Sequence, residues 1–512
     1  MADKPRYRVQ AGSAPLMAGV SPLATPPGIP GHPVASPFVA ASGGRRLSGW
    51  RPTGSGPNAA LQMSGGEMLR RSRDLRRNNP FGKRAMDLTV THAIGTGIKP
   101  RSLCRNKRIV AALSELWDEW TRVSDADGVF DFYGQQALAF GEMVEGGEAF
   151  ARLRPRQLSD GLPVPLQIQL IPSEQVPLGY ALPSDGNPVL QGIERDRIGR
   201  RAGYWMYDQH PGDLTAPGVG ISLMPKRVSA VDICHLYNQT RIGQLRGVPW
   251  LAAAMTSVHQ AHAYLDAELL RKQMSAMLVA AIESPVGVDS GPDGLKAAIG
   301  VPAEDDIVTM EPGSVMALRA GEKITFNQPA DVGQSFEPFM AATYRAVSSA
   351  ANLIYEELTG NWKDTNDRTF RAAFNTFKRQ VSYWQYSLMC VQFCWPVWSR
   401  FVDYAVASGA LRVPKSVTDR DLKRVAWSPQ RHAYINPIQD ITATGEELTL
   451  GLTSRTAEIL ERGDDPEQVD QQIAEDRTRE AEHGLAFTPG NIGAKAAMAA
   501  DGATLPHDGA TP

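Results

Sequence analysis

Cysteine is scarce in this chain of 512 residues, which contains four. None of them forms a CxxC pair, and four are too few for the disulfide framework of a small secreted protein. A chain of this length buries well over half of its surface on folding, so it needs neither disulfides nor a structural metal. The sequence therefore favours a reducing compartment.

Uninterrupted apolar runs are also missing. The stretch 380–399 carries no charge and is long enough to cross a bilayer, but glutamines, serines and Pro396 interrupt it. A short apolar piece at 15–20 follows a basic N-terminus, and the prolines after it break any continuous apolar core. We therefore expect no signal peptide, no transmembrane helix and no membrane partner.

Signatures of catalysis are absent as well. The chain has no P-loop and no Gly-x-Ser-x-Gly motif, and the Gly-Thr-Gly at 95–97 lacks the third glycine of a dinucleotide site. His259 and His262 share a helix face without the glutamate of a zinc hydrolase, so we interpret them as packing or interface residues. Cys390 and Cys394 lie among large apolar residues and are expected in the core. The sequence thus predicts no catalytic residue, metal site or cofactor.

The net charge of −2 hides two oppositely charged regions. Residues 67–108 hold 12 Lys and Arg against 3 Asp and Glu, a net charge of +9. Residues 437–485 hold 4 against 13, a net charge of −9. Each region alone is typical of a solvated helix face. Together they also suit a protein that meets nucleic acid and assembles into a ring, and charge does not decide between these interpretations.

Local patterns predict an α+β, mainly helical fold. Apolar residues recur at helical spacing within 62–92 and 106–121, and a third helix is expected behind Asp131, a favourable N-cap. Between 148 and 237 the pattern changes to short runs separated by Pro and Gly turns, which predicts a β-rich unit. The runs are Ala149 to Leu153, Leu166 to Ile171, Gly192 to Arg197, Gly203 to Tyr207 and Val231 to Tyr237.

Two long helices are expected after the β-rich unit. The first begins at Pro249, a favoured first-turn residue, and ends near Ile282. The second spans 335–358, about 36 Å at 1.5 Å per residue. Residues 283–333 between them are punctuated by Gly and Pro and are expected to form a small α/β module.

A third long helix follows a short polar loop at 359–368. From Phe370 to Trp395 its apolar residues are alternately four and three apart, so it should pack along another long helix. Pro396 should then bend or stop it. The acidic region beyond residue 436 predicts two further helices, the second of which begins with the N-cap Asp465.

The two ends of the chain differ from the middle. Proline and glycine make up 18 of the 50 residues at 11–60, against 84 of all 512. We therefore expect a disordered arm at 1–60. Residues 486–512 are rich in Ala, Gly and Pro and are expected to form a flexible tail.

Six blocks of the sequence, in order, resemble the lambda-type portal proteins of tailed bacteriophages. The most specific is His235 to Leu251, which reads HLYNQTRIGQLRGVPWL. The resemblance covers roughly 45–485. The other blocks are Arg71 to Phe81 with His92 to Ile98, Gly146 to Arg152, Leu170 to Val176, Glu356 to Gly360 with Thr369 to Ala373, and Leu460 to Glu467.

The resemblance implies a homo-oligomeric ring of about twelve subunits around an axial channel. Such a ring lies at one capsid vertex of the virion and is assembled in the host cytoplasm. Double-stranded DNA passes through it non-specifically, driven by a separate terminase, and its other partners are head–tail connector, major capsid and scaffold proteins. A portal is not an enzyme. One alternative is an unrecognised soluble nucleic-acid-processing enzyme. Another is a head–tail adaptor ring, but adaptor proteins are usually much shorter than this chain.

The resemblance also implies a portal fold with wing, stem, clip and crown. After the arm at 1–60 come a wing at 61–248, a stem helix at 249–282, a clip at 283–333, a second stem helix at 334–358 and a tunnel loop at 359–368. A long kinked helix with its connection at 369–435, an acidic helical crown at 436–485 and the tail at 486–512 complete the chain. The crown is expected to face packaged DNA, where repulsion would discourage sticking.

The tunnel loop supplies the candidate DNA-facing residues. Its charges nearly balance, because Lys363 and Arg368 are set against Asp364 and Asp367. The alternative is that the two cations pair with these neighbouring aspartates. The candidates are Asn361, Lys363, Asn366 and Arg368.

The basic segment between residues 70 and 84 is a second candidate interface. Its positive charges could contact DNA, the capsid shell or a neighbouring subunit, and we favour a subunit or capsid contact over DNA. The residues are Arg70, Arg71, Arg73, Arg76, Arg77, Lys83 and Arg84.

Overall fold

The computed structural model describes residues 49–183, 185–213, 224–276, 280–283, 323–326, 336–363, 365–430 and 436–485. Most of the expected arm, most of the expected clip and the whole expected tail lie outside these residues. The part from Pro57 onward groups as one unit, and the description below concerns that unit.

The N-terminal part of this unit is helical, as the periodicity predicted. Its helices are α1 (Pro57–Asn78), α2 (Pro80–Ala93), α3 (Lys107–Thr121) and α4 (Phe132–Gly146). Side chains cap three of them: Asn79 accepts from the Gly82 N–H, Asn106 from the Ile109 N–H and Asp131 from the Gly134 N–H. Helix α1 begins at Pro57, so the boundary of the disordered arm at residue 60 is wrong. Proline suits this first turn because its φ is already helical.

Two antiparallel sheets follow. The first has the order β3-β2-β8 and consists of β2 (Glu148–Pro155), β3 (Leu166–Pro172) and β8 (Ile233–Tyr237). The second has the order β4-β5-β6-β7 and consists of β4 (Val189–Leu190), β5 (Ile193–Arg195), β6 (Arg201–Met206) and β7 (Lys226–Ser229). All five predicted runs contain a strand, and Gly199 (φ 84°) supplies the left-handed residue of the β5–β6 turn.

The first expected long helix is shorter than predicted. Helix α5 (Met255–Ala276) begins six residues after Pro249. Residues 250–254 form turns. The Trp250 N–H donates to the Val144 carbonyl at 3.1 Å, so the start of this stretch is bonded to α4. At its other end, Ala280–Glu283 is a strand, β9, paired with β10 (Lys323–Phe326), and not the end of a helix.

The second expected long helix is broken. Helix α7 (Phe336–Ala351) ends just before Asn352, whose φ is 54°, and α8 (Tyr355–Thr359) follows. The Leu353 N–H donates to the Ser348 carbonyl at 2.9 Å and closes the end of α7. Asparagine tolerates this left-handed conformation better than most residues, so a pattern of apolar spacing does not reveal the break.

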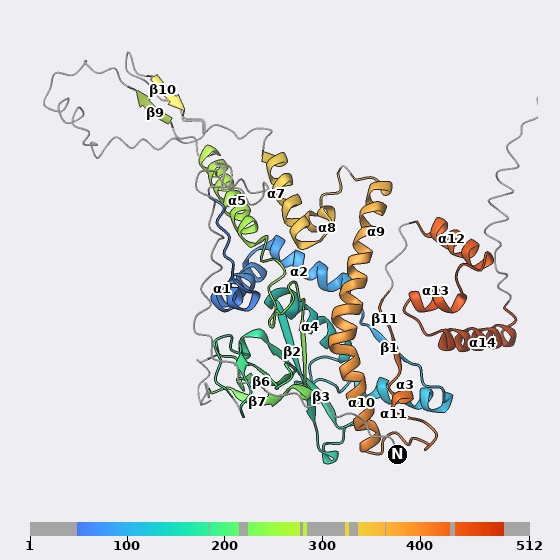
Figure 1. Cartoon of the computed structure of the whole chain (residues 1–512). Coiled ribbons are helices and arrows are strands. Elements are labelled where there is room, and N and C mark those ends of the chain that lie inside the picture. Colours follow the sequence, from blue (N-terminus) through green and yellow to red (C-terminus); the bar gives the residue numbers. More distant parts are fainter. Residues whose placement is uncertain are drawn as a thin grey trace, which may run out of the picture. The chain divides into compact units, whose positions relative to one another are not determined.

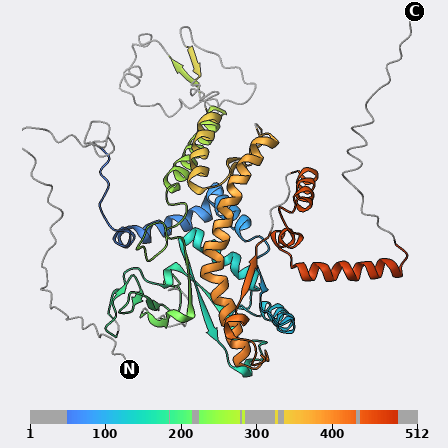
Figure 2. The same ribbon diagram turned by 45° about the vertical axis from the view of Figure 1, so that its right-hand side comes forward.

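The third long helix continues past Pro396. Helix α9 (Asp367–Tyr383), the π-helix η7 (Trp384–Cys394) and α10 (Trp395–Ala407) form one unbroken helical run, orange in Figure 1 and Figure 2. The π-helix has a wider turn than an α-helix, so the positions that face the core shift by about one residue along the sequence. Val391 and Trp395, predicted in the seam, are therefore 41% and 37% exposed, whereas Phe393 and Cys394 are fully buried.

The seam predicted packing along another long helix; within the described ranges, this helical run instead contacts several short elements. The π-helix packs on β8, α9 contacts α2, and α10 contacts β3. An aromatic cluster joins α3, α4 and α10, with the Trp117 ring centroid 5.1 Å from Trp398 and from Phe132. Cys390 and Cys394 are buried, as expected.

The C-terminal region contains three helices where two were predicted. They are α12 (Pro437–Thr449), α13 (Arg455–Glu461) and α14 (Pro466–Glu482), and Gly451 (φ 70°) lies in the turn between the first two. Asp465 caps α14 as predicted, accepting from the Glu467 N–H at 2.9 Å. Before them, α11 (Asp419–Leu422) leads to β11 (Val425–Ser428), which pairs with β1 (Lys99–Ser102). The mainly helical α+β class is confirmed.

Candidate nucleic-acid interface

The polar loop at 359–368 connects α8 to α9, and both of its ends are fixed. At the α8 end, Gly360 adopts a left-handed conformation (φ 70°), and its N–H donates to the Glu356 carbonyl at 2.8 Å. At the α9 end, Asn366 is the N-cap, and its side chain accepts from the Thr369 N–H at 2.9 Å. The sequence therefore builds a loop with defined ends from a glycine C-cap and an asparagine N-cap.

Between these ends, residues 361–363 present their side chains to solvent. Lys363 is 71% exposed, and its Nζ lies 3.9 Å from Oε1 of Glu337 in α7. Asn361 accepts from the Lys363 backbone N–H at 3.1 Å, and Trp362 is half-exposed against Phe370. Among the residues that the structure describes, Lys363 thus makes one weak, solvated ion pair, and its partner lies outside the loop.

Arg368 lies in the first turn of α9 and is exposed. Within the part of the chain that the structure describes, it makes no ion pair, and Asp364, one of the aspartates considered above, lies outside that part. The side chains of Asn361 and Asn366 accept hydrogen bonds from nearby backbone N–H groups. Asn361 does so in the turn and Asn366 as the N-cap of α9. Lys363 and Arg368 are therefore the candidates whose charged ends face solvent.

Helix α2 contacts α8, the helix that precedes the loop. The Arg84 Nε–H donates to the Glu357 carbonyl at 2.7 Å, and His92 Nε2 lies 3.0 Å from the Glu357 carboxylate. These contacts span more than 260 residues of sequence, so no local pattern reveals them.

Two arginines of the basic segment lie in an internal ion-pair network. Arg73 contacts Glu142, Glu145 and Glu174, with Nη1 to Glu142 at 2.7 Å and Nη2 to Glu174 at 2.9 Å. Arg76 Nη1 lies 2.7 Å from Glu145. Burial raises the pKa of Glu142 to about 7 against the opposing hydrogen bonds from Arg73. This network ties α1 to α4 and occupies both guanidinium groups within the chain.

The other cations of the segment are exposed. Arg70 and Arg71 pair with Glu67 in their own helix, and Lys83 pairs with Asp87 at 2.6 Å. Arg77 is exposed, and Arg84 is exposed apart from its bond to Glu357. Exposed pairs within one helix are weak, so these cations remain open to a partner.

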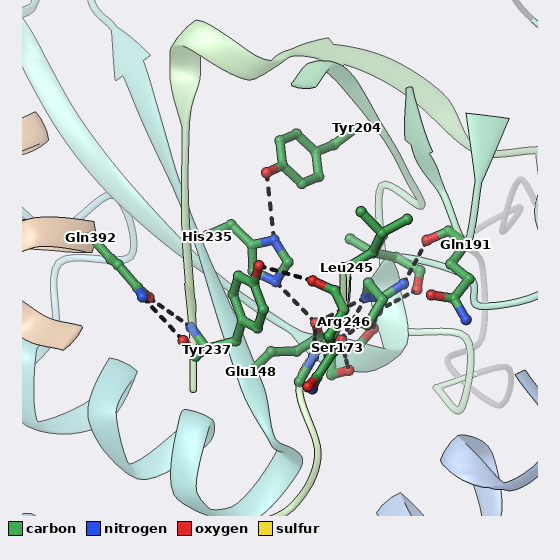
Figure 3. Close-up of polar contacts among 12 residues, drawn as sticks. Glu148, Ser173, Gln191, Tyr204, His235, Tyr237, Leu245, Arg246 and Gln392 are labelled. Atoms are coloured by element: carbon green, nitrogen blue, oxygen red, sulfur yellow. Dashed lines mark hydrogen bonds and ion pairs between the residues drawn. The ribbon is translucent and has the colours of Figure 1, made fainter. Parts of the chain in front are cut away.

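A buried polar network in the sheet region was not singled out from the sequence. Arg246 is fully buried and donates through Nε to both carboxylate oxygens of Glu148, at 2.7 and 2.9 Å (Figure 3). Its Nη groups donate to the carbonyls of Gln191 and Val176 at 2.7 and 3.0 Å. Arg246 therefore joins β2 to the segment before the second sheet and to the turn between β4 and β5.

His235 completes this network. Its Nε2 lies 3.0 Å from Glu148, and its ring stacks between Phe150 and Tyr237. Burial lowers the pKa of His235 to about 4, so the ring is neutral at pH 7. Nδ1 faces a guanidinium N–H of Arg201, so it accepts, and the proton sits on Nε2, which donates to Glu148. His235 and Arg246 both belong to the sequence block 235–251.

The chain matches the family model described as "Phage portal protein, lambda family" over residues 43–385. The chain belongs to this family. It is 26% identical over 439 residues to a probable portal protein of Halomonas phage phiHAP-1, covering 81% of this chain and 80% of the relative. It is 21% identical over 485 residues to the portal protein of Escherichia phage N15, covering 86% and 89%.

Among solved structures, the chain is similar to one in "Neck of native GTA particle computed with C12 symmetry". The identity is 14%, the TM-score is 0.45, and the match covers 79% of this chain and 94% of that one.

Phage portal proteins are structural, non-enzymatic proteins of the virion. In the described ranges of this member, no group of three His, Cys, Asp or Glu side chains is placed to hold a metal ion. Among the helices that the structure covers, none combines the length and apolar composition needed to cross a bilayer. The block 235–251 carries the buried Arg246 and His235, so this part of the family resemblance corresponds to a packing network in the chain.

Proposed function

We propose that the chain forms the ring at one capsid vertex through which double-stranded DNA enters and leaves the particle. About twelve copies would surround an axial channel. Family membership supports the portal role. The single observation in the structure that supports a DNA-facing surface is the loop at 359–368, which has capped ends and carries the exposed Lys363 and Arg368.

The chemistry of this loop suits a surface past which DNA slides. Each phosphate that a protein neutralises adds affinity and salt dependence, so a conduit needs few tight phosphate contacts. Lys363 is held 3.9 Å from Glu337, and both side chains are 71% exposed, which is a weak pair. Repeated around a ring, one loosely held cation per subunit produces a sizeable field without a tight site.

The remaining segments of the portal follow from the same proposal. Helices α5 and α7 would form the stem, and the β9–β10 pair would belong to the clip, where terminase and later head–tail connector proteins dock. Helices α12 to α14 would form the crown. The exposed cations Arg70, Arg71, Arg77, Lys83 and Arg84 would contact a neighbouring subunit or the capsid shell, and the ring would be assembled with major capsid and scaffold proteins in the host cytoplasm.

Electron microscopy and native mass spectrometry of the purified chain test this proposal. We expect closed rings of about twelve subunits with a central hole. A monomer or dimer that persists at high protein concentration, and with capsid and scaffold proteins present, would contradict the portal role. Nuclease or ATPase activity of the purified chain would instead favour an enzyme.

A further inference from the structure

A pocket lined by arginines opens beside the first turn of α3. Arg105, Arg420 and Arg424 line it together with a single carboxylate, that of Asp421. Arg424 Nη1 lies 3.3 Å from Asp421 Oδ1, and Arg105 Nε lies 4.0 Å from the same oxygen. Three cations against one anion leave the pocket with an excess of two positive charges.

The arginines of this pocket are available to an outside partner. The Arg105 side chain is 87% exposed, and Arg420 is exposed and has no ion pair with any residue that the structure describes. The other lining side chains, Ser416 and Thr418 among them, are mostly polar. The pocket therefore suits a partner that carries negative charge, and not an apolar one.

Helix α14 has the complementary character. Between Glu467 and Glu482 it holds six Asp and Glu against two Arg, a net charge of −4. Pro466 is its one buried residue. Glu475 and Glu482 are seven residues apart, so they share one helix face, and both are exposed. Neither makes an ion pair within the described ranges. A polar helix with so little packing in its own chain leaves its charged side chains open to a partner.

The geometry of α14 separates this acidic face from the pocket of its own chain. Lys107 Nζ lies 3.5 Å from Glu467 Oε1, which places the first turn of α14 beside the start of α3. Glu482 is fifteen residues further along, about 22 Å at 1.5 Å per residue. A helix is rigid over this length, so Glu482 lies well away from Arg105, which is two residues before Lys107. No cation of the described residues pairs with Glu475 or Glu482, so this face is open to a basic surface of another molecule.

We propose that the Glu475 and Glu482 face of α14 docks on the arginine pocket around Arg420 of a second copy of this chain. The inference rests on the proposed ring, because a closed ring gives every α14 a neighbouring pocket. The contact is electrostatic and exposed at its rim, so it weakens as salt rises and governs the rate and register of assembly.

Charge reversal and charge exchange in the full chain test this contact. Two reversed variants are needed, Arg420→Glu and the double variant Glu475→Arg/Glu482→Arg, together with their combination. Sedimentation velocity and native mass spectrometry across a NaCl series give the apparent subunit affinity. We expect each reversed variant to lose about tenfold in affinity and the combination to recover most of it. Arg197→Glu, a reversal on the exposed β5–β6 turn, is the matched control and should behave as the wild type.

The outcomes separate this inference from the proposed function. Wild-type rings whose salt dependence is unaffected by either reversal would overturn the docking contact and leave the portal ring intact. A wild-type chain that never associates would overturn both. Loss of duplex DNA binding by Arg420→Glu, with unchanged subunit affinity, would make the pocket a nucleic-acid contact and overturn the subunit contact. Recovery in the combined variant also excludes misfolding as the cause of the single losses.

Discussion

Arg246 and Glu148 form a completely buried ion pair, with 0% and 2% of their side chains exposed and two hydrogen bonds of 2.7 and 2.9 Å from one guanidinium nitrogen. Burial alone would raise the pKa of Glu148, but the Arg246 charge and the bond from His235 hold it well below its usual value. The carboxylate is therefore ionised, and the network depends on its cation.

Removal of that cation should destabilise the chain. For Arg246→Met we expect a loss of about 3–5 kcal/mol in the free energy of unfolding, because the substitution leaves a buried carboxylate unpaired. The double variant Arg246→Met/Glu148→Gln should recover part of the loss. Thermal unfolding of both variants checks this, with the exposed Arg197→Met as control. An unchanged melting temperature for Arg246→Met would contradict the stabilising role.

The buried His235 should make stability depend on pH. Its pKa is about 4 in the folded chain and 6.5 in a model peptide, so between these values the unfolded chain binds a proton that the folded chain excludes. Stability is therefore full above pH 6.5 and falls toward pH 4, by about 1.4 kcal/mol per unit and about 3 kcal/mol in all.

Melting temperatures at pH 7.5 and pH 5, compared between the wild type and His235→Gln, measure this effect. The pKa of Glu142, raised to about 7, acts in the opposite direction, so the difference between the two proteins is the quantity that reports on His235. We expect a larger fall in the wild type. Equal falls would show that His235 does not titrate as its burial requires.

The ion-pair network around Arg73 should also contribute to stability. Arg73→Met leaves Glu142, Glu145 and Glu174 together without their shared cation, and we expect a cost of about 2–4 kcal/mol. Arg77→Met, four residues along the same helix and exposed, is the matched control and should stay within about 0.5 kcal/mol. Thermal unfolding of the two variants measures the difference. Similar melting temperatures for the two variants would show that Arg73 contributes no more to stability than an exposed arginine does.

Lys363 should contribute to DNA binding and not to the stability of the fold. Lys363→Ala should assemble and melt like the wild type, because the side chain is 71% exposed and its ion pair with Glu337, at 3.9 Å, is weak. Binding of duplex DNA to the assembled protein should weaken, and the slope of log affinity against log salt should fall by about 0.9 for each lysine that contacts a phosphate. Lys363→Arg should retain binding. An unchanged slope in Lys363→Ala would show that this lysine does not contact DNA.

Local sequence predicted those elements whose ends are fixed by neighbouring residues. Asp131 and Asp465 cap helices, as predicted, because their side chains reach backbone N–H groups two or three residues away. Asn79 and Asn106 act in the same way and were not predicted as caps. The five strand runs were found because Pro and Gly turns separate them. The same local logic failed at Asn352, where one left-handed residue breaks a periodic apolar pattern, and in the π-helix, where a wider turn rotates the buried face.

The candidate site was likewise predicted only in part from the sequence. The sequence indicated the polar loop and its exposed Lys363, because a loop between two capped helices can be read from adjacent residues. It did not indicate that Arg73 and Arg76 pair within the chain, since their carboxylates lie 69 and 101 residues away. Nor did it indicate the Arg246–Glu148 pair, which spans 98 residues.

Family, fold class, helix caps and the charge contrast between the two regions thus follow from the order of the amino acids. The folded chain alone shows which charges are buried, which carboxylate pairs with which arginine, and where long helices break or change register. The physical reason is that caps and turns depend on contacts across a few residues, whereas ion pairs and buried faces depend on distant segments that meet only after folding.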